Sequence, residues 1–173
     1  FVDRVRCLRE WMPELGLPAF DENEFAEMLP ALCRGRRSIA ELKKAPLLAR
    51  LKARLEHHQL RAVERHAPER ITVPSGSRVQ VRYEPGQRPV LAVRIQELFG
   101  LTESPRIASG RVKLLLHLLA PNGRPQQVTD DLVSFWDNTY AQVRKELRAR
   151  YPKHSWPEDP RKADPERRPR RRR

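Results

Sequence analysis

The hydrophobic period of the chain changes near Glu69, and this change constrains the fold more than any other feature of the sequence. Before it, apolar residues recur every three or four positions, which is the spacing of one face of an α-helix. After it, apolar and polar residues alternate over short runs bounded by proline and glycine, as in half-buried β-strands. The pattern predicts an α+β chain, with a helical domain over residues 1–67 and a β-rich domain over residues 68–160.

Capping residues and helix breakers divide the first part of the chain into helices that can form a bundle. The expected helices span residues 3–12, 21–34 and 46–65. Asp21 can cap the second helix, because its carboxylate accepts a hydrogen bond from a backbone N–H group of the first turn. Ser38 and Glu41 have the spacing of a capping box. Pro46 suits the first turn of the last helix, where its missing N–H group costs nothing.

Turn residues separate five short runs that have the alternating pattern of strands. The expected strands span residues 71–73, 79–83, 90–95, 112–119 and 126–128. Asn122 and Gly123 form a dipeptide that favours a tight hairpin turn between the last two strands. Five short strands fit either a small antiparallel barrel of the OB type or an open antiparallel sheet, and the pattern leaves both possibilities open.

A last amphipathic helix and a proline-rich arm follow the strands. Thr129 or Asp130 can cap this helix, whose apolar stripe over residues 132–147 is expected to pack behind the β-rich part. Trp156 is expected to hold the following arm against the domain. Residues 161–173 consist almost entirely of proline and charged residues and are predicted to form a disordered basic tail.

The chain carries 35 Lys and Arg residues against 22 Asp and Glu residues, which gives a formal net charge of +13. A surplus of this size favours an anionic partner, and nucleic acid is the first candidate. The surplus is uneven, because residues 161–173 hold eight basic and two acidic side chains and contribute +6, which leaves +7 for the other 160 residues. Charge alone therefore does not assign the folded part to nucleic-acid binding.

The sequence lacks the motifs that build common catalytic and metal sites. It contains no glycine-rich phosphate loop and no nucleophile elbow. His57 and His58 are adjacent and point to different sides of a helix, so they cannot bind one metal ion together. Cys7 and Cys33 match no zinc or redox spacing and are expected to be two buried thiols of a cytoplasmic protein. No apolar run approaches the roughly 18 residues of a membrane span, so no membrane partner is expected. Because the motifs above are lacking, neither a cofactor nor a metal is expected for this chain.

Three stretches of the sequence together resemble one known family. They are residues 67–79 (APERITVPSGSRV), residues 89–106 (PVLAVRIQELFGLTESPR), and segments between 115 and 160 that include the FW pair at 135–136 and the strings RYPKH and WPEDP. They are similar to the C-terminal region of the bacterial HrpB family of DEAH-box-related ATP-dependent helicases. Ser109 and Lys113 depart from that pattern, which has Gly and Pro there, and the departures concern local turn shape.

The resemblance implies a parent enzyme that hydrolyses ATP with Mg²⁺ and moves along or unwinds RNA. The motor motifs of such helicases lie in two upstream RecA-like domains and match no position here, so no catalytic residue is carried over to this chain. In related helicases a helical domain followed by an OB-like domain closes over the nucleic-acid channel. The order of helices and strands in this sequence is similar to that arrangement.

Basic side chains and turn donors are the candidates for contacts to nucleic acid, because the phosphate backbone supplies most of the sequence-independent affinity. Three groups are expected, at the first hairpin turn, around the second hairpin, and on the last helix with its arm. They consist of Ser75, Ser77, Arg78 and Arg82; of Arg111, Lys113 and Arg124; and of Arg144, Lys145, Arg148, Arg150 and Lys153. Each of these is alternatively a solvated surface group, and the run Arg170–Arg173 is either a phosphate clamp or a solubilising tail. Phe135 and Trp136 could stack on bases, but their place on the apolar stripe favours the core.

Two functions compete. In the first, the chain is the auxiliary, non-catalytic part of an ATP-dependent RNA helicase, which binds RNA or another single-stranded nucleic acid and docks on the RecA-like motor domains of the same polypeptide. In the second, it is a structural or protein-interaction module without nucleic-acid contact, whose helical region and Trp156–Pro160 arm dock on the motor domains or another protein. The first function predicts a salt-dependent affinity for single strands. The second predicts an affinity for motor domains that does not depend on Arg144 and Lys145.

Overall fold

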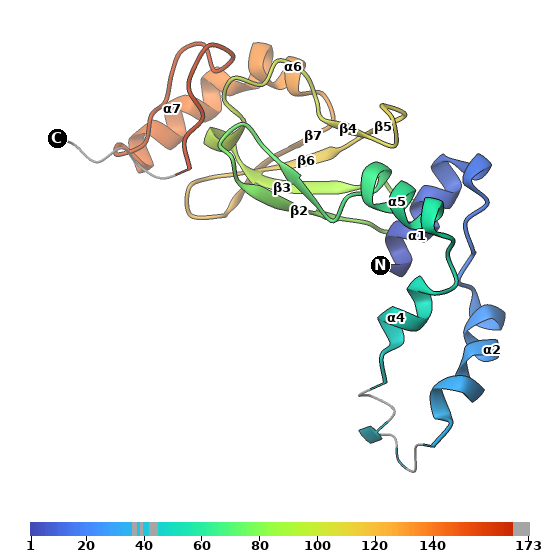
Figure 1. The fold of residues 1–173 in the computed structure, drawn as a ribbon. Helices are drawn as coiled ribbons and strands as arrows, with labels where there is room; N and C mark the ends of the chain where they lie inside the picture. The colour runs from blue at the N-terminus through green and yellow to red at the C-terminus, as the bar shows by residue number, and fades with distance from the viewer. Residues whose placement is uncertain (36–37, 39, 42–44, 168–173) are drawn as a thin grey trace. The chain divides into compact units, whose positions relative to one another are not determined.

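The computed structural model describes residues 1–35, 38, 40–41 and 45–167, and the chain in it divides into two compact units (Figure 1). The first unit comprises Phe1–Pro68 together with Glu84–Gly86 and is helical. The second unit comprises the rest of the chain from Glu69 onward and contains the strands. Each unit has its own buried apolar residues, so each is described by itself.

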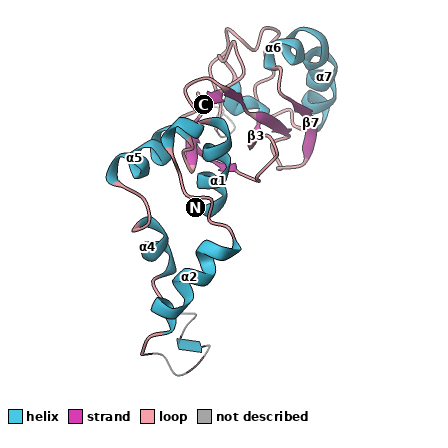
Figure 2. Cartoon of the chain, turned by 90° about the vertical axis from the view of Figure 1, so that its right-hand side faces the viewer, coloured by secondary structure: helices cyan, strands magenta, loops and turns pink. Residues whose placement is uncertain are grey.

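Four α-helices and a 3-10 turn form the described part of the first unit. They are α1 (Val2–Trp11), η1 (Pro13–Leu15), α2 (Glu22–Cys33), α4 (Leu47–Lys52) and α5 (His57–His66). Figure 2 shows α2 and α4 side by side. Arg54, two residues after the end of α4, forms an ion pair of 3.2 Å with Glu27 of α2. The centre of the unit is apolar, since Val5, Leu8 and Val63 are fully buried.

The helix starts in this unit agree with the sequence in part. The backbone N–H group of Glu24 donates to the Asp21 carboxylate at 2.9 Å, which confirms the predicted cap. The Glu41 N–H group donates to Ser38 Oγ at 3.2 Å, which is one half of the predicted capping box. The helix predicted over residues 46–65 is wrong as a single element, because Glu56 and Gln59 form a capping box that starts α5 as a helix of its own.

A buried arginine that the sequence pattern did not reveal joins the first and last helices of this unit. Arg4 lies on α1, its Nε donates to the Ala67 carbonyl at 2.6 Å, and its Nη2 lies 3.0 Å from the Glu64 carboxylate. A buried guanidinium is costly unless its N–H groups have partners. The two partners come from α5 and the residue after it, so this contact fixes how α1 lies against α5.

The two cysteines lie in different environments, and the prediction of two buried thiols is wrong for one of them. Cys7 is buried, whereas Cys33 is exposed in the last turn of α2, off the side of the helix that buries Met28 and Leu32. Burial, followed by the negative charges of Glu10 and Asp3, raises the pKa of the Cys7 thiol to about 11. The Cys7 thiol is therefore protonated at neutral pH.

We expect the folded protein to react with a thiol reagent such as DTNB at one cysteine only at pH 8. A pKa of about 11 leaves roughly one thousandth of the Cys7 thiol as thiolate at that pH, and only the thiolate reacts. Unfolding in guanidinium should release the second thiol. Cys33→Ser should remove the fast phase, and two fast equivalents in the folded wild-type protein would contradict the assignment.

The second unit is built on a five-stranded sheet with the strand order β1-β2-β3-β6-β7. The strands are β1 (Arg70–Thr72), β2 (Arg78–Arg82), β3 (Val90–Arg94), β6 (Leu115–Leu119) and β7 (Pro125–Thr129). β3 and β6 are parallel, and the other neighbouring pairs are antiparallel. A separate two-stranded ribbon consists of β4 (Arg106–Ile107) and β5 (Val112–Lys113).

The sequence left an OB-like barrel and an open antiparallel sheet as alternatives, and the structure contains an open sheet that is not fully antiparallel. Among the described residues β1 and β7 each pair with one neighbour only, so the sheet is open and not a closed barrel. It is also mixed, because the chain between residues 95 and 114 returns to the side where β3 began before β6 starts. The run Leu115–Leu119 is almost continuously apolar, as is common for a strand with a parallel neighbour, although only Leu116 and Leu118 of it are buried.

Helical segments cover one face of this sheet. They are η2 (Ile95–Leu98), α6 (Leu132–Ser134), the π-helical turn η3 (Phe135–Thr139) and α7 (Tyr140–Arg150), and Figure 1 shows α6 and α7 over one side of the strands. The cap of α6 is Asp131, which accepts from the Ser134 N–H group at 3.0 Å. It is neither Thr129 nor Asp130 as predicted, because Thr129 Oγ1 accepts from the Asp131 N–H group and Asp130 pairs with Arg88.

The core of the second unit lies between the sheet and these helices. Leu91 and Val93 of β3 alternate with half-buried neighbours and are buried on the helical side, as are Leu116 and Leu118 of β6. Aromatic rings of the helical layer pack against one another there. The rings in contact are Phe99, Phe135, Trp136 and Tyr140. Phe135 and Trp136 therefore belong to the core, as the apolar stripe predicted.

The arm after α7 is packed onto the second unit, and Trp156 holds it there as predicted. The Tyr140 hydroxyl donates to the Pro157 carbonyl at 3.0 Å, and burial raises the pKa of this phenol above its ordinary value, so it stays a donor. The buried Glu166 accepts from the Ser155 N–H group at 3.0 Å. The disordered tail was expected from residue 161, whereas in the structure Glu166 is buried and Arg161, Ala163 and Pro165 are half-buried. The run Arg170–Arg173 lies outside the described residues.

We predict that Leu118→Ala lowers the free energy of unfolding by about 2–5 kcal/mol, because it leaves a cavity beneath the helical layer. Val128→Ala on the neighbouring strand is the matched control. Val128 is 50% exposed, so its truncation should change the stability by less than about 1 kcal/mol. Urea denaturation followed by circular dichroism measures both. Equal losses for the two variants would contradict the assignment of the buried face.

Candidate nucleic-acid interface

The two serines of the first candidate group face a carboxylate of their own unit. Ser75 Oγ donates to the Glu97 carboxylate at 2.9 Å and lies 3.1 Å from Ser77 Oγ. Glu97 is only 6% exposed, and Arg94 lies 3.7 Å from its other oxygen. Both hydroxyls are therefore used inside the second unit, next to a negative charge that repels a phosphate. The two serines therefore stabilise the conformation of this turn.

The two arginines of the first group, in contrast, lie on an exposed surface. Arg78 and Arg82 are exposed residues of β2 on the same side as Gln80, because side chains two positions apart in a strand share a face. β1 adds Arg70, which pairs in register with Gln80 and whose Nη1 donates to the backbone carbonyl of Arg78. No side chain among the described residues forms an ion pair with Arg78 or Arg82.

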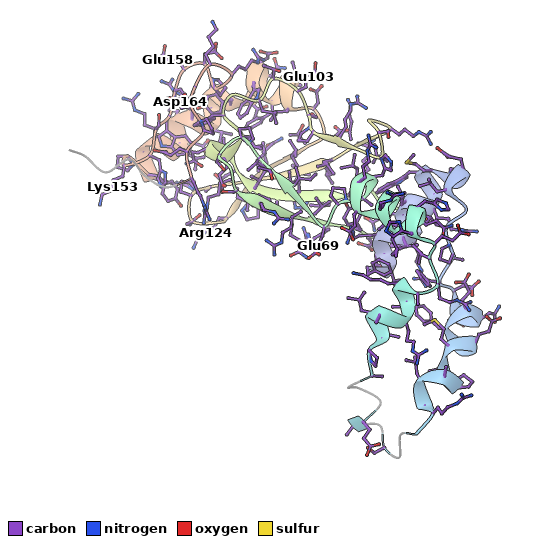
Figure 3. All side chains as sticks on the ribbon, viewed as in Figure 1. Glu69, Glu103, Arg124, Lys153, Glu158 and Asp164 are labelled. Atoms are coloured by element: carbon purple, nitrogen blue, oxygen red, sulfur yellow. The ribbon has the colours of Figure 1, made fainter. Side chains whose placement is uncertain are left out.

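The structure does not bring the second candidate group together. Arg111 and Lys113 belong to the β4–β5 hairpin, which ends just before β6 begins, while Arg124 lies in the turn that follows the other end of β6. Figure 3 shows Arg124 at that turn, with its side chain directed away from the sheet. Each of these residues is exposed. They are separate surface cations and do not form one site.

The turn between β4 and β5 contains two neighbouring residues in the left-handed backbone conformation. Ser109 has a positive φ of 55°, and its neighbour Ala108 has a φ of 50°. This left-handed conformation is free of steric cost for glycine and strained for residues with a Cβ atom. Ala108 and Ser109 therefore adopt this turn with some backbone strain.

The third candidate group does form one surface. A groove of about 1110 Å³ runs along α7. One of its walls is α7, and the arm after α7 forms the other. Its lining comprises Ala141, Arg144, Lys145, Arg148, Ala149, Pro152, His154, Trp156, Pro157 and Glu158. Three of the five predicted cations thus line one groove. Arg150 and Lys153 are exposed and lie outside the lining, and Figure 3 shows Lys153 beyond the end of α7.

The three cations of the groove have different roles. Arg144 is committed to the arm, because its Nε donates to the Trp156 carbonyl at 2.9 Å and its Nη2 lies 3.3 Å from the Glu158 carboxylate. Lys145 and Arg148 are exposed, and no described residue forms an ion pair with either of them. Arg144 therefore builds the wall of the groove, and the other two supply its accessible positive charge.

Two residues that hold the arm against the second unit were missed because they lie in the segment predicted to be a tail. Arg161 forms an ion pair with Asp137 of the π-helical turn. Glu166 lies 3.4 Å from His154, which lines the groove, and its backbone N–H group donates to the Gln96 carbonyl at 2.9 Å. In the sequence these residues are hidden among arginines and prolines. Two isolated carboxylates in a basic segment are the only signal that could have indicated internal partners.

The described residues offer charge and hydrogen-bond donors rather than a constellation for chemistry. No group of three or more His, Cys, Asp or Glu side chains in the described part of the chain is placed to hold a metal ion. Nor is any helix of that part long and apolar enough to cross a bilayer. What the groove can do is hold a negatively charged chain by its backbone.

Comparison with known proteins places the chain in a family. Residues 28–160 match the family model HrpB_C, described as the C-terminal part of ATP-dependent helicases. The chain belongs to the HrpB_C family. The matched residues include both flanks of the α7 groove and all five strands of the sheet. The family resemblance of the three sequence stretches is thereby confirmed.

Relatives with known names are similar to this HrpB_C chain over most of its length. It is 41% identical over 170 residues to the ATP-dependent RNA helicase HrpB of Escherichia coli strain K12, which covers 95% of this chain and 21% of the relative. A crystal structure of the E. coli DExH-box NTPase HrpB superposes with a TM-score of 0.89 at 39% identity, over 95% of this chain and 21% of that one.

A second crystal structure, of the Escherichia coli DEAH/RHA helicase HrpB, gives a TM-score of 0.73 at 38% identity and covers 90% of this chain and 20% of that one. The HrpB_C chain therefore spans about a fifth of the length of the relatives that it matches. The part of those relatives that it resembles is accordingly one region of a much longer protein.

We predict that Ser75→Ala destabilises the protein by about 1–3 kcal/mol and leaves its affinity for single-stranded RNA unchanged. The substitution removes the hydroxyl donor of a buried carboxylate, which is the costly way to lose a hydrogen bond. Thermal denaturation and fluorescence anisotropy measure the two quantities on the same sample. A weaker affinity at unchanged stability would show that Ser75 contacts the nucleic acid instead.

Proposed function

We propose that this HrpB_C chain is the C-terminal accessory part of an ATP-dependent RNA helicase. It contacts the RNA strand through the α7 groove, docks on RecA-like motor domains of the same polypeptide, and does not catalyse ATP hydrolysis. ATP and Mg²⁺ belong, in this proposal, to the motor domains outside this chain. Support comes from the family, from the name of the E. coli relative, and from the charge of the groove.

The accessible cations of the groove carry this proposal. Lys145 and Arg148 are three residues apart on α7, so they project from the same face of the helix. Both line the groove, and neither forms an ion pair with a described residue. Two adjacent cations beside a hollow of this size can bind consecutive phosphates of one strand.

Backbone contacts of this kind suit a protein that moves along nucleic acid. Lys and Arg contacts to phosphates depend on salt and carry no sequence information. A motor that translocates must hold any sequence with similar strength. We therefore assign the groove to holding the strand and not to recognising a sequence.

Arg144 has a positioning role in this proposal. Its guanidinium holds the Trp156 carbonyl and the Glu158 carboxylate, so it fixes the arm that forms the second wall of the groove. Replacing Arg144 should widen the groove before it removes a contact to the strand. For this reason Lys145 and Arg148 are the better pair for a direct test.

A different surface favours the second candidate function, that of a protein-interaction module. The first unit has an apolar hollow of about 250 Å³, lined by Phe25, Leu29, Leu32, Ala45 and Leu47. Leu29 and Leu47 are 50% and 45% exposed, and solvent contact at such leucines is typical of docking surfaces. Docking through the helical region therefore remains part of the second candidate function. The Trp156–Pro160 arm is a poorer docking element, because Trp156 is buried in its own unit.

We predict that Lys145→Gln with Arg148→Gln weakens the binding of single-stranded RNA. Removing two phosphate contacts should lower the slope of log affinity against log salt by about 1.4, and roughly tenfold in affinity should be lost at low salt. Fluorescence anisotropy with a labelled oligouridine over a salt series measures both.

The matched control is Arg61→Gln with Arg65→Gln, two exposed arginines of α5 that remove the same charge from the first unit. It should bind RNA like the wild-type protein. Shortening the chain after Arg167 tests the arginine run separately and keeps the packed residues of the arm. An equal effect of both double variants would mean that net charge, and not the groove, determines the affinity.

A further inference from the structure

The five-stranded sheet carries charge of one sign only. Its strands contain four arginines and no Asp, Glu or Lys residue. The arginines are Arg70, Arg78, Arg82 and Arg94. All four are exposed. In an average protein about a quarter of the residues are charged and both signs are mixed, so a sheet without any carboxylate is a distinctive surface.

The strand register places all four arginines on the same face. Arg70 of β1 pairs with Gln80 of β2, and residues 78 and 82 lie two positions either side of Gln80. Arg82 in turn pairs with Val90 of β3, which lies four residues before Arg94 and therefore on the same side of the strand. Because side chains alternate across a strand, these residues all project from the face opposite to Leu91 and Leu116. The core is on that other side, so this is the open face of the sheet.

A strip of uncharged side chains crosses the same face beside the arginines. Ala92 of β3 pairs with His117 of β6, and His117 pairs with Val128 of β7. Ala92 and His117 are half-buried, and Val128 is 50% exposed. The open face thus has a cationic part on β1 and β2 and a largely apolar part, with one imidazole ring, on β3, β6 and β7.

Three of the four arginines are available to a ligand. Arg94 is held 3.7 Å from the buried Glu97, so its charge is partly compensated. Arg70 donates to a backbone carbonyl, which does not neutralise its charge, and Arg78 and Arg82 have no ion-pair partner among the described residues. Glu69 precedes β1 and has the opposite parity to Arg70. The cationic part of the face is therefore formed by Arg70, Arg78 and Arg82.

We infer that the open face of the sheet binds single-stranded nucleic acid, with phosphates at Arg70, Arg78 and Arg82 and base faces over the Ala92–His117–Val128 strip. A single strand offers both features, a row of phosphates and unstacked bases whose flat faces cover apolar or ring surfaces. In a duplex the base faces are stacked inside, so a duplex can use only the arginines. The arrangement favours single strands over duplexes.

This inference rests on the proposed nucleic-acid role and names the class of strand and a second surface for it. The α7 groove lies on the helical layer, which covers the other face of the sheet, so a short strand uses one surface or the other. An acidic protein segment is the alternative occupant. The open face suits a run of Asp and Glu residues less well, because such a run supplies no flat ring surfaces for the uncharged strip.

The test compares three double variants of the full chain. They are Arg78→Gln with Arg82→Gln on the sheet, Lys145→Gln with Arg148→Gln in the groove, and Arg61→Gln with Arg65→Gln as the charge-matched control. The probes are a labelled oligouridine of about 12 nucleotides and an RNA duplex of the same length. We expect the sheet variant to lose roughly tenfold in single-strand affinity and about 1.4 in salt slope relative to the control.

The single variant His117→Ala tests the uncharged strip without changing the arginines. It should weaken single-strand binding by at least about fivefold and leave duplex binding unchanged, since only an unstacked base can cover the ring. Thermal denaturation confirms that the variant is folded. An equal loss for both probes, or no loss in the folded variant, overturns the assignment of bases to this strip.

The outcomes separate the two surfaces. If the sheet variant binds like the control while the groove variant is weakened, the inference is overturned and the proposed function stands. If the sheet variant is weakened and the groove variant is not, the inference stands and the groove proposal fails. Unchanged RNA affinity of the sheet variant together with loss of binding to a labelled oligoglutamate peptide would assign the face to an acidic protein segment and overturn the inference.

Discussion

The parallel ladder between β3 and β6 is the constraint on which the second unit depends. It sets Leu91 against Leu116 and Val93 against Leu118, and these four side chains form the floor beneath the helices. It also requires the chain to cross back between residues 95 and 114, which is the segment that supplies η2 and Glu97. Because one face of the ladder is filled in this way, every charged side chain of the sheet must project from the other face.

Sequence periodicity predicted most of the local elements but not how the strands pair. The alternation around Val81 and the apolar stripe of the last helix predicted a strand and a helix that the structure contains. A parallel neighbour for β6 depends on the path of the twenty residues before it, and the pattern of a single run does not encode that path. The break between α4 and α5 could have been predicted, since Glu56 and Gln59 have the spacing of a helix start.

The residues of the candidate site differ in the same way, since local spacing predicted some of them and the pairing of strands determines the others. Lys145 and Arg148 were found because helical spacing alone places them on one face. Ser75 was misleading, because its acceptor Glu97 is 22 residues away in the sequence and is brought to it only by the fold. Arg70 and Arg94 were overlooked for the corresponding reason. Their common face with Arg78 follows from the register of three strands, which a sequence does not specify by itself.

The packing of the arm has a consequence for the order in which this unit assembles. Gly100 donates to the Pro160 carbonyl and the Gln96 carbonyl accepts from Glu166, so the segment that seals η2 is made after every other element of the unit. Until that segment has been synthesised, the backbone groups of residues 96 and 100 lack these partners, and the nascent domain is more exposed to proteases and to association with other chains. The side-chain amide of Gln96 is buried without a hydrogen-bond partner among the described residues, so its burial costs free energy that the rest of the unit must offset.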